Sequence, residues 1–184
     1  MPGMMTNNTL DDLRAFRAQL YASFRQRRDA LFEFTDAALT AGQIPSLAHL
    51  SLEDAHRRDW GRLYTALSQG SFDAEAVRDE LAHHPLANGQ PICAVDVSVW
   101  PRCDAETSPE RGFYYHPSRH SNGKPIVAGW AYQWIAQLSF KRDSWTAPLD
   151  VRRVHPINDG NANAVAVEQI KALIRRLPSA NQAV

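Results

Sequence analysis

The pattern of apolar and polar positions changes once along the chain, near residues 85–90. Before this point apolar residues recur at spacings of three and four, as in Leu10, Leu13, Phe16, Leu20 and Phe24. Such spacing places the apolar side chains on one face of a helix. Residues 1–88 therefore predict a helical N-terminal domain.

Polar and basic residues indicate where these helices begin and end. The run Arg25, Arg27 and Arg28 interrupts the first apolar stripe and predicts a break or turn between two helices. Ser51 is placed as the N-cap of the stripe that follows, and Asp73 as the cap of a further short helix. Short polar side chains at these places accept hydrogen bonds from the free N–H groups of a first turn.

From residue 89 the pattern becomes that of strands. Residues 92–100 are apolar and rich in β-branched side chains, residues 126–140 are long, apolar and aromatic, and residues 147–154 form a third such segment. Gly129 leaves two readings of the middle segment open, either one long strand or two strands joined by a bulge. The polar stretch 103–123 contains Pro, Gly and Ser and predicts a loop without a regular element.

Helical spacing returns over residues 163–177, and Pro178 follows its end. Short connections between the three strands predict an antiparallel meander, with this last helix on one face of the sheet. The fold class expected is therefore mixed, α/β in the broad sense and α+β in the narrower one. A helical domain over residues 1–88 precedes a domain over residues 89–184.

Composition and charge leave the class of partner open. Lys plus Arg (20) balances Asp plus Glu (20), and a local patch matters more for nucleic-acid binding than this sum. The N-terminus lacks the basic and apolar regions of a signal peptide, and no apolar run approaches the roughly 18 residues that span a bilayer. We therefore expect a cytoplasmic protein without a membrane partner, in which Cys93 and Cys103 are reduced thiols.

One carboxylate, Asp96, interrupts the strand predicted over residues 92–100. Alternation places Asp96 and Ser98 on one face, and the exposed face of an antiparallel strand carries such residues without any function. The alternative is a carboxylate held on a rigid strand as a ligand of a hard cation such as Mg²⁺, which prefers oxygen. One carboxylate does not make a metal site, so the spacing alone leaves both readings open.

Basic side chains gather in the predicted loop that follows. They are Arg102, Arg111, Arg119, His120 and Lys124, and they surround the aromatic pair Tyr114 and Tyr115. A positive, hydrogen-bonding loop beside a strand carboxylate suits contacts to a phosphodiester, whereas a solvated loop needs no ligand to explain it. The arginines of the helical part allow the same two readings.

Several other classes of site are disfavoured. His116 and His120 are four residues apart, but Pro117 opposes the helix that would align them for zinc, and no CxxC pair is present. The chain contains no P-loop, no dinucleotide-binding fingerprint and no nucleophile elbow.

Three segments together resemble the front of a DDE-type insertion-sequence transposase, an endonuclease with an RNase H-like core. They are AVDVSVWPR, YYHPSRHSNGKPIVAGWAYQWIAQLSF and APLDVRRVHP. The family's first catalytic aspartate lies on the first core strand in the pattern apolar-Asp-x-Ser/Thr-x-aromatic-Pro-basic, which Asp96, Ser98, Trp100, Pro101 and Arg102 match position by position. The resemblance implies that Asp96 is a catalytic residue and a ligand of Mg²⁺ or Mn²⁺. With the basic loop, it implies that Arg102, Arg119, His120 and Lys124 contact DNA.

The resemblance also implies a gap in the catalytic site. The family's core continues with a fourth strand that carries a second aspartate and a helix that carries a glutamate, and these complete the metal triad. No acid of this chain matches either position: Asp104, Glu106 and Glu110 lie in the loop, and Asp143 and Asp150 flank the third strand. The second domain is therefore expected to be a truncated RNase H-like core that binds no metal stably alone.

The function expected is that of a transposase fragment. The complete enzyme would cut DNA and transfer strands by two-metal phosphoryl transfer, with insertion-sequence ends and target DNA as partners, and the fragment would be inactive alone. The alternatives are a non-catalytic DNA-binding or oligomerising module that modulates a full-length transposase, and an inert gene remnant. Without its outer neighbour, the strand 92–100 would be an exposed edge that favours a homo-oligomer.

Overall fold

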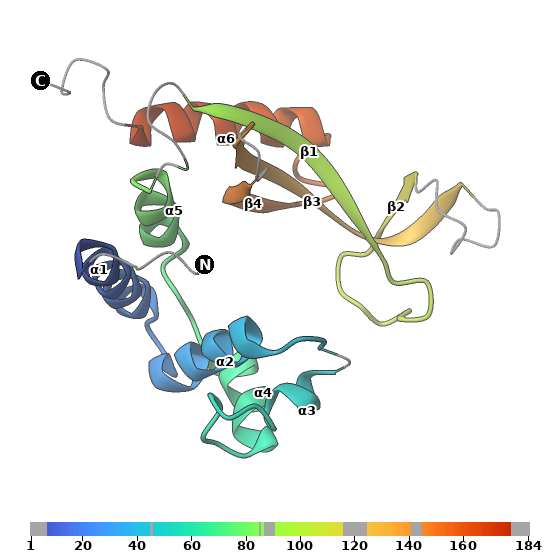
Figure 1. Cartoon of the computed structure of the whole chain (residues 1–184). Coiled ribbons are helices and arrows are strands. Elements are labelled where there is room, and N and C mark those ends of the chain that lie inside the picture. Colours follow the sequence, from blue (N-terminus) through green and yellow to red (C-terminus); the bar gives the residue numbers. More distant parts are fainter. Residues whose placement is uncertain are drawn as a thin grey trace, which may run out of the picture. The chain divides into compact units, whose positions relative to one another are not determined.

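A computed structural model of the chain describes residues 7–44, 46–84, 86, 91–115, 125–140 and 145–177 (Figure 1). The chain divides into two compact units, Met1–Glu80 and Leu81–Val184. Helices make up the first unit, whereas an antiparallel sheet and a helix make up most of the second. This combination confirms the expected mixed fold class.

The first unit is helical, as the periodicity predicts. Its described helices are α1 (Asn7–Ser23), α2 (Arg28–Thr40), α3 (Leu47–Leu50), α4 (Trp60–Gln69) and α5 (Ala74–Ala82), the last of which ends just past the unit's boundary. The predicted break at the basic run is confirmed, because α1 ends before it and α2 begins within it. Arg27 precedes α2 with a left-handed backbone, φ 54°.

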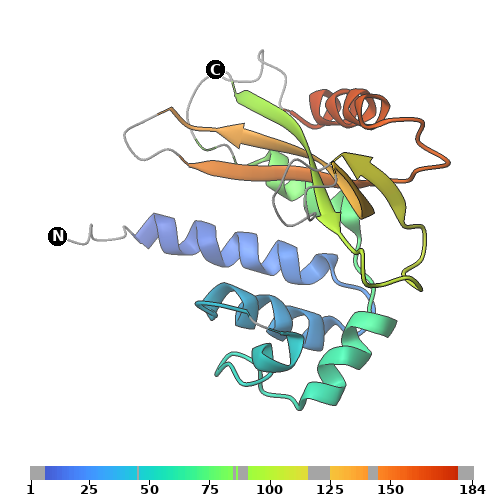
Figure 2. The ribbon, with the colours of Figure 1, turned by 90° about the vertical axis from the view of Figure 1, so that its right-hand side faces the viewer.

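Aromatic and ionic contacts join α1 to α2, which lie side by side (Figure 2). The rings of Tyr21 and Phe32 meet edge to face with centroids 5.2 Å apart. The Arg17 guanidinium donates to both carboxylate oxygens of Asp36, at 2.7 and 3.0 Å. Such a two-pronged pair fixes the geometry of two helices more tightly than a single contact does.

The buried core of this unit is small and formed by α2, α3 and α4. Ala37 and Leu63 are completely buried, and Leu50 is nearly so. Phe34 and Ala38 of α2 pack around these side chains. These contacts hold the three helices together, whereas the stripe that begins at Leu10 lies on α1, outside this cluster.

The helix caps agree with the sequence at one place and differ at another. Asp73 Oδ1 accepts a hydrogen bond from the backbone N–H of Ala76 at 3.1 Å, which confirms the predicted cap of α5. The predicted N-cap at Ser51 is wrong, because Ser51 follows the last residue of α3. Asp59 caps α4 instead, accepting from the N–H of Arg62 at 2.9 Å, since turns occupy residues 51–55.

The sheet of the second unit has four strands in its described part, not the three that the sequence predicts. They are β1 (Ile92–Pro101), β2 (Gly112–Tyr115), β3 (Ile126–Leu138) and β4 (Thr146–Val154). All pairings are antiparallel, and β3 is central: β1 pairs along one side of it, and β2 and β4 pair along the other. β2 lies inside the stretch 103–123 that the sequence predicts to be a loop. The sequence does not predict this strand, because four residues are too few to show an alternating pattern.

Gly129 lies in one continuous strand rather than at a bulge. A Cβ at this position would stand 2.2 Å from the carbonyl oxygen of Trp100, so glycine permits the close approach of β1 and β3. The irregularity of β3 lies later, where the register against β4 shifts between Ile135 and Ala136. Pro148 pairs with Ala136 at this shift, a place where a strand tolerates a missing N–H donor.

The helix α6 (Ala162–Arg176) packs on one face of the sheet, against β3 and β4 (Figure 1). Alternate residues of β3 from Val127 to Gln137 are buried, and the residues between them are half-buried. The buried set includes Gln133, whose carbonyl oxygen accepts a hydrogen bond from Gln169 of α6 at 3.2 Å. The predicted helix on one face is therefore confirmed.

β1 is the most exposed long strand of this sheet. Among the described residues it pairs with β3 alone, so its other edge has no strand beside it. Val95 and Val97 pair with the buried Ile135 and Gln133 and so belong to the α6 face, yet they remain 39% and 42% exposed. The helix thus covers β3 but leaves much of β1 open.

Candidate functional site

The face of the sheet opposite α6 collects one carboxylate and several aromatic rings. We call this surface the open face and define it by Asp96, Ser98 and Trp100 of β1 and Trp130, Tyr132 and Trp134 of β3. Cross-strand partners share a face, and Asp96 pairs with Trp134, Ser98 with Tyr132, and Trp100 with Trp130. Alternation along β1 thus puts the polar residues of the motif on the open face.

Asp96 is exposed on this face but fixed in position. Its Oδ1 accepts a hydrogen bond from the backbone N–H of Val97 at 2.8 Å. From the α6 side, the Gln133 Nε2 donates to the carbonyl oxygen of Asp96 at 2.9 Å. The backbone that carries the carboxylate is therefore held through the ladder with β3 and through a buried side chain beneath it.

Arg102 extends the same surface beyond the end of β1. Its backbone N–H donates to the carbonyl oxygen of Ala128 at 2.7 Å, and its guanidinium lies 5.4 Å from the ring centroid of Trp130. The neighbouring rings of Trp100 and Tyr132 are 5.7 Å apart. Asp96 and Arg102 thus stand at two ends of one aromatic strip.

Arg153 of β4 joins this surface, and the sequence reading missed it. Its guanidinium lies 5.0 Å from the Trp130 ring and donates to the carbonyl oxygens of Pro109 and Glu110, both at 2.9 Å. The Trp130 indole also donates to Pro109, at 3.0 Å. Arg153 pairs with Tyr132, so only the strand register indicates that it shares the open face.

Two residues of the stretch read as a basic loop make structural hydrogen bonds, Arg111 within the loop and Tyr114 from β2 to β4. Arg111 donates to the carbonyl oxygens of Arg102 and Cys103, at 2.7 and 3.3 Å. The Tyr114 hydroxyl donates to the carbonyl oxygen of Val154 at 3.3 Å. Burial raises the pKa of Tyr114, and the charge of Arg153 opposes this rise, so the phenol stays a neutral hydrogen-bond donor at ordinary pH.

The other basic residues predicted to contact DNA, Arg119, His120 and Lys124, lie outside the residues that the structure describes. Asp143 lies outside them as well. For these positions the sequence expectation remains a prediction.

The described residues do not fit a metal site around Asp96. Asp150 pairs with Ile135, so it belongs to the α6 face, where it bonds Arg152 at 3.0 Å. Glu110 contacts Arg153 and His155, at 3.3 and 3.1 Å. Among the described residues, no group of three His, Cys, Asp or Glu side chains is placed to hold a metal ion. Two-metal chemistry needs several such ligands.

Two further sequence expectations can be compared with the structure. Cys93 and Cys103 are both free thiols and exposed. In the part of the chain that the structure describes, no helix combines the length and the apolar character needed to cross a membrane.

Comparison with known protein families identifies the family of this chain. The family model described as DDE superfamily endonuclease matches residues 19–183. This match covers most of both units and supports a nuclease-like function on DNA, in a family that generally uses divalent metal ions. No curated protein and no solved structure shows a significant match. The resemblance read from the segment around Asp96 is therefore confirmed, and the chain belongs to the DDE superfamily of endonucleases.

Proposed function

We propose that this chain supplies the first part of the catalytic core of a DNA transposase, with Asp96 as the first of the three metal-binding acids. The observation that carries the proposal is the position of the motif from Asp96 to Arg102 along one open face of the first core strand. In a DDE endonuclease this face would receive the scissile phosphate. The second aspartate and the glutamate would come from polypeptide outside these 184 residues.

The same proposal makes the isolated chain inactive as a nuclease. A lone carboxylate does not position two ions for in-line attack on a phosphodiester. Two other acids of the sheet unit, Asp150 and Glu110, are paired with Arg152 and Arg153. The chain would thus bind DNA without cutting it. Sequencing the DNA beyond codon 184 tests the fragment reading, because a shifted frame should encode the missing strand and helix.

Incubation of the purified chain with supercoiled plasmid and Mg²⁺ or Mn²⁺ tests the inactivity. We expect no nicking above background for the chain, for Asp96→Ala, or for the control Asp104→Ala, which changes an exposed loop acid. Cleavage by the unmodified chain that is abolished in Asp96→Ala and kept in Asp104→Ala would contradict the proposal. It would mean that an acid of this chain or of a second copy completes the site.

Phosphate contacts from Arg102, Arg119 and Lys124 would dominate DNA binding by the second unit. Such contacts depend steeply on salt and little on sequence. Neutralising the three together should weaken binding at low salt for every duplex tested, which distinguishes them from residues that read bases. Unchanged affinity would show that DNA contacts another surface of the chain and not this loop.

A second candidate function is a non-catalytic module that joins a full-length transposase and modulates it. The observation that favours it is the open edge of β1, which offers backbone N–H and C=O groups to another strand. Co-purification with a full-length DDE transposase, lost when the edge is blocked, would support this function.

A further inference from the structure

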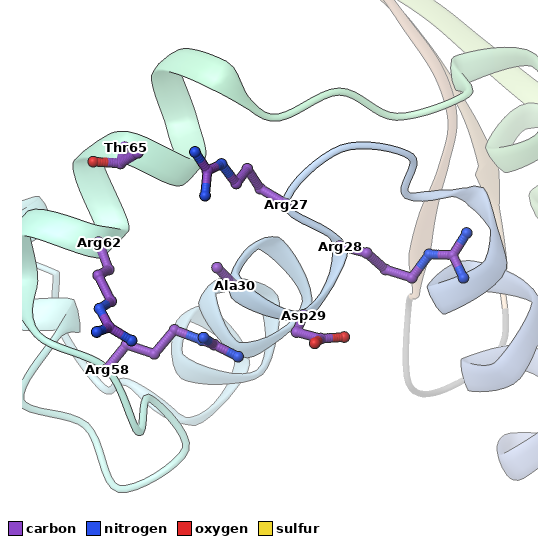
Figure 3. A pocket seen from close by; sticks show the side chains of 7 residues that line it. All are labelled: Arg27, Arg28, Asp29, Ala30, Arg58, Arg62 and Thr65. Carbon is purple, nitrogen blue, oxygen red and sulfur yellow. The ribbon is translucent and has the colours of Figure 1, made fainter.

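The helical unit contains a pocket lined by four arginines (Figure 3). Its lining residues are Arg27, Arg28, Asp29, Ala30, Arg58, Arg62 and Thr65, and its volume is about 370 Å³. A volume of this size lies within the range of small-ligand sites, about 300–1,000 Å³. None of these residues belongs to the open face, so the candidate functional site does not explain why basic side chains gather at this pocket.

The arginines reach the pocket from separate segments of the chain. Arg27 and Arg28 stand at the start of α2, Arg58 lies in the turn before α4, and Arg62 lies in the first turn of α4. Arg27, Arg58 and Arg62 extend around the pocket, whereas Arg28 and Asp29 also line it but point their charged ends away from the other arginines (Figure 3). The tertiary fold thus brings together basic side chains that are up to 35 residues apart in the sequence, as Arg27 and Arg62 are.

The carboxylates of this unit neutralise its other arginines but leave two uncompensated. In the described part of the unit, the pairs within 4 Å are Arg14–Asp11, Arg17–Asp36, Arg25–Asp73, Arg57–Glu33, Arg58–Glu33, Arg62–Asp59 and Arg78–Glu75. The contacts of Arg27 and Arg28 are neutral instead. Arg27 donates to the Gln69 side chain at 2.7 Å, and Arg28 donates to the carbonyl oxygen of Phe24 at 2.8 Å.

The nearest acid, Asp29, keeps its negative charge but directs its carboxylate toward α1. Asp29 lines the pocket, but its Oδ1 accepts a hydrogen bond from the Tyr21 hydroxyl at 2.6 Å, on the side of α1. No side chain caps the start of α2, so the helix dipole leaves partial positive charge there, which Asp29 in the first turn offsets in part. Arg58, by contrast, is fixed by two hydrogen bonds to Glu33, so it contributes shape more than free charge.

From this arrangement we infer that the pocket binds a backbone phosphate of DNA, with Arg27 and Arg62 as its main contacts. Among the described residues, the Arg27 guanidinium has unused N–H donors. Arg62 has an ion pair with Asp59 at 3.3 Å, but this pair is exposed and solvent weakens it, and the Arg62 side chain is 68% exposed. Guanidinium groups match the geometry of phosphate oxygens. The choice of DNA as the source of the phosphate rests on the proposed function, while the preference for a phosphate rests on the pocket alone.

Fluorescence anisotropy with a short labelled DNA duplex at about 50 and 200 mM salt tests this inference. The double variant R27Q/R62Q should bind about tenfold more weakly at the lower salt, and its salt slope should fall by about two. The matched control R14Q/R175Q loses the same charge at exposed positions on α1 and α6 and should change binding much less. Circular dichroism checks folding, and R62Q alone serves if the double variant unfolds.

The possible outcomes separate this inference from the proposed function. If the chain binds the duplex and R27Q/R62Q behaves like the control, the pocket assignment is overturned while the DNA function stands. If the unmodified chain binds no duplex at either salt and inorganic phosphate does not raise its melting temperature, both are overturned. If inorganic phosphate raises the melting temperature of the chain but not of R27Q/R62Q, and no duplex binds, the pocket takes free phosphate and the DNA assignment is wrong.

Discussion

In the helical unit, α2, α3 and α4 enclose Ala37, Leu50 and Leu63, and carboxylates accompany most of the arginines. In the sheet unit, β3 is buried on its α6 face while β1 exposes side chains on both faces. The first unit therefore pairs most of its arginines, although it also exposes apolar side chains such as Leu39 and Trp60. In the described part of the second unit, the edge of β1 presents unpaired backbone groups as well as apolar side chains to solvent. This difference suggests that a partner is needed at β1 more than among the helices.

The two units also differ in what they bury. The core cluster of the helical unit is apolar, with Ser23 and His56 buried outside it, whereas the sheet unit buries the amides Gln133, Gln137 and Gln169 beside Ile135. Buried amides need hydrogen-bond partners, and Gln133 finds one in the carbonyl oxygen of Asp96. Polar burial in the sheet unit thus supports the strand that carries the candidate catalytic acid.

The largest loss of stability should come from truncating a buried side chain in the core of either unit. Leu63→Ala in the helical unit and Ile135→Ala in the sheet unit each remove a fully buried side chain and should lower the free energy of unfolding by about 2–5 kcal/mol. Hydrogen exchange should place each loss in the unit that carries the change. If either variant accelerates exchange equally in both units, they unfold together and the comparison fails.

Replacing the buried amides should lower the free energy of unfolding by less, and by different amounts for Gln133 and Gln169. Gln133→Leu removes the donor to Asp96 and should cost about 1–3 kcal/mol. Gln169→Met should cost less, because the Gln169 Oε1 is buried without a hydrogen-bond partner in the described structure and its loss relieves that cost. Urea unfolding of both variants measures the difference. Equal losses would show that the unpaired Gln169 Oε1 does not lower the cost of its replacement.

The open edge of β1 should cause the chain to self-associate. Val97→Lys places a charge beside this edge and should weaken association about tenfold or more, a change of about 1.4 kcal/mol. Val167→Lys on α6, at a similarly exposed position, is the control. Sedimentation measures both. A monomeric chain in which the amides of Cys93 to Val99 exchange slowly would show that β1 needs no partner.

The smallest expected effect is on how the stability of the helical unit depends on pH. Hydrogen bonds from Arg25 and from the N–H of Ala76 hold the pKa of Asp73 below its ordinary value of 3.8. A lowered folded-state pKa stabilises the fold above the unfolded pKa, and this contribution disappears as pH falls through the folded value. Thermal melts between about pH 5 and 2.5 should therefore decline less for Asp73→Asn than for the parent chain. Parallel declines would exclude Asp73 as the cause.

The sequence alone predicted the elements that have a long and clear period. The stripe from Leu10 to Phe24 gave α1, the β-branched run gave β1, and the motif around Asp96 gave the family, because each depends on neighbours in the chain. It did not predict β2, which has four residues and exists through its pairing with β3. Nor did it predict the cap of α4, since Ser51 and Asp59 offer the same chemistry.

Only the tertiary structure decided which polar groups stand together. The register against β3 places Arg153 beside Trp130 and puts Asp150 on the opposite face from Asp96, and no spacing within one strand contains that information. The pocket of Arg27 and Arg62 likewise depends on how α2 packs against α4. The sequence determined the elements and the motif because both follow from local periodicity. The sites required the fold because their residues meet only through contacts between distant segments.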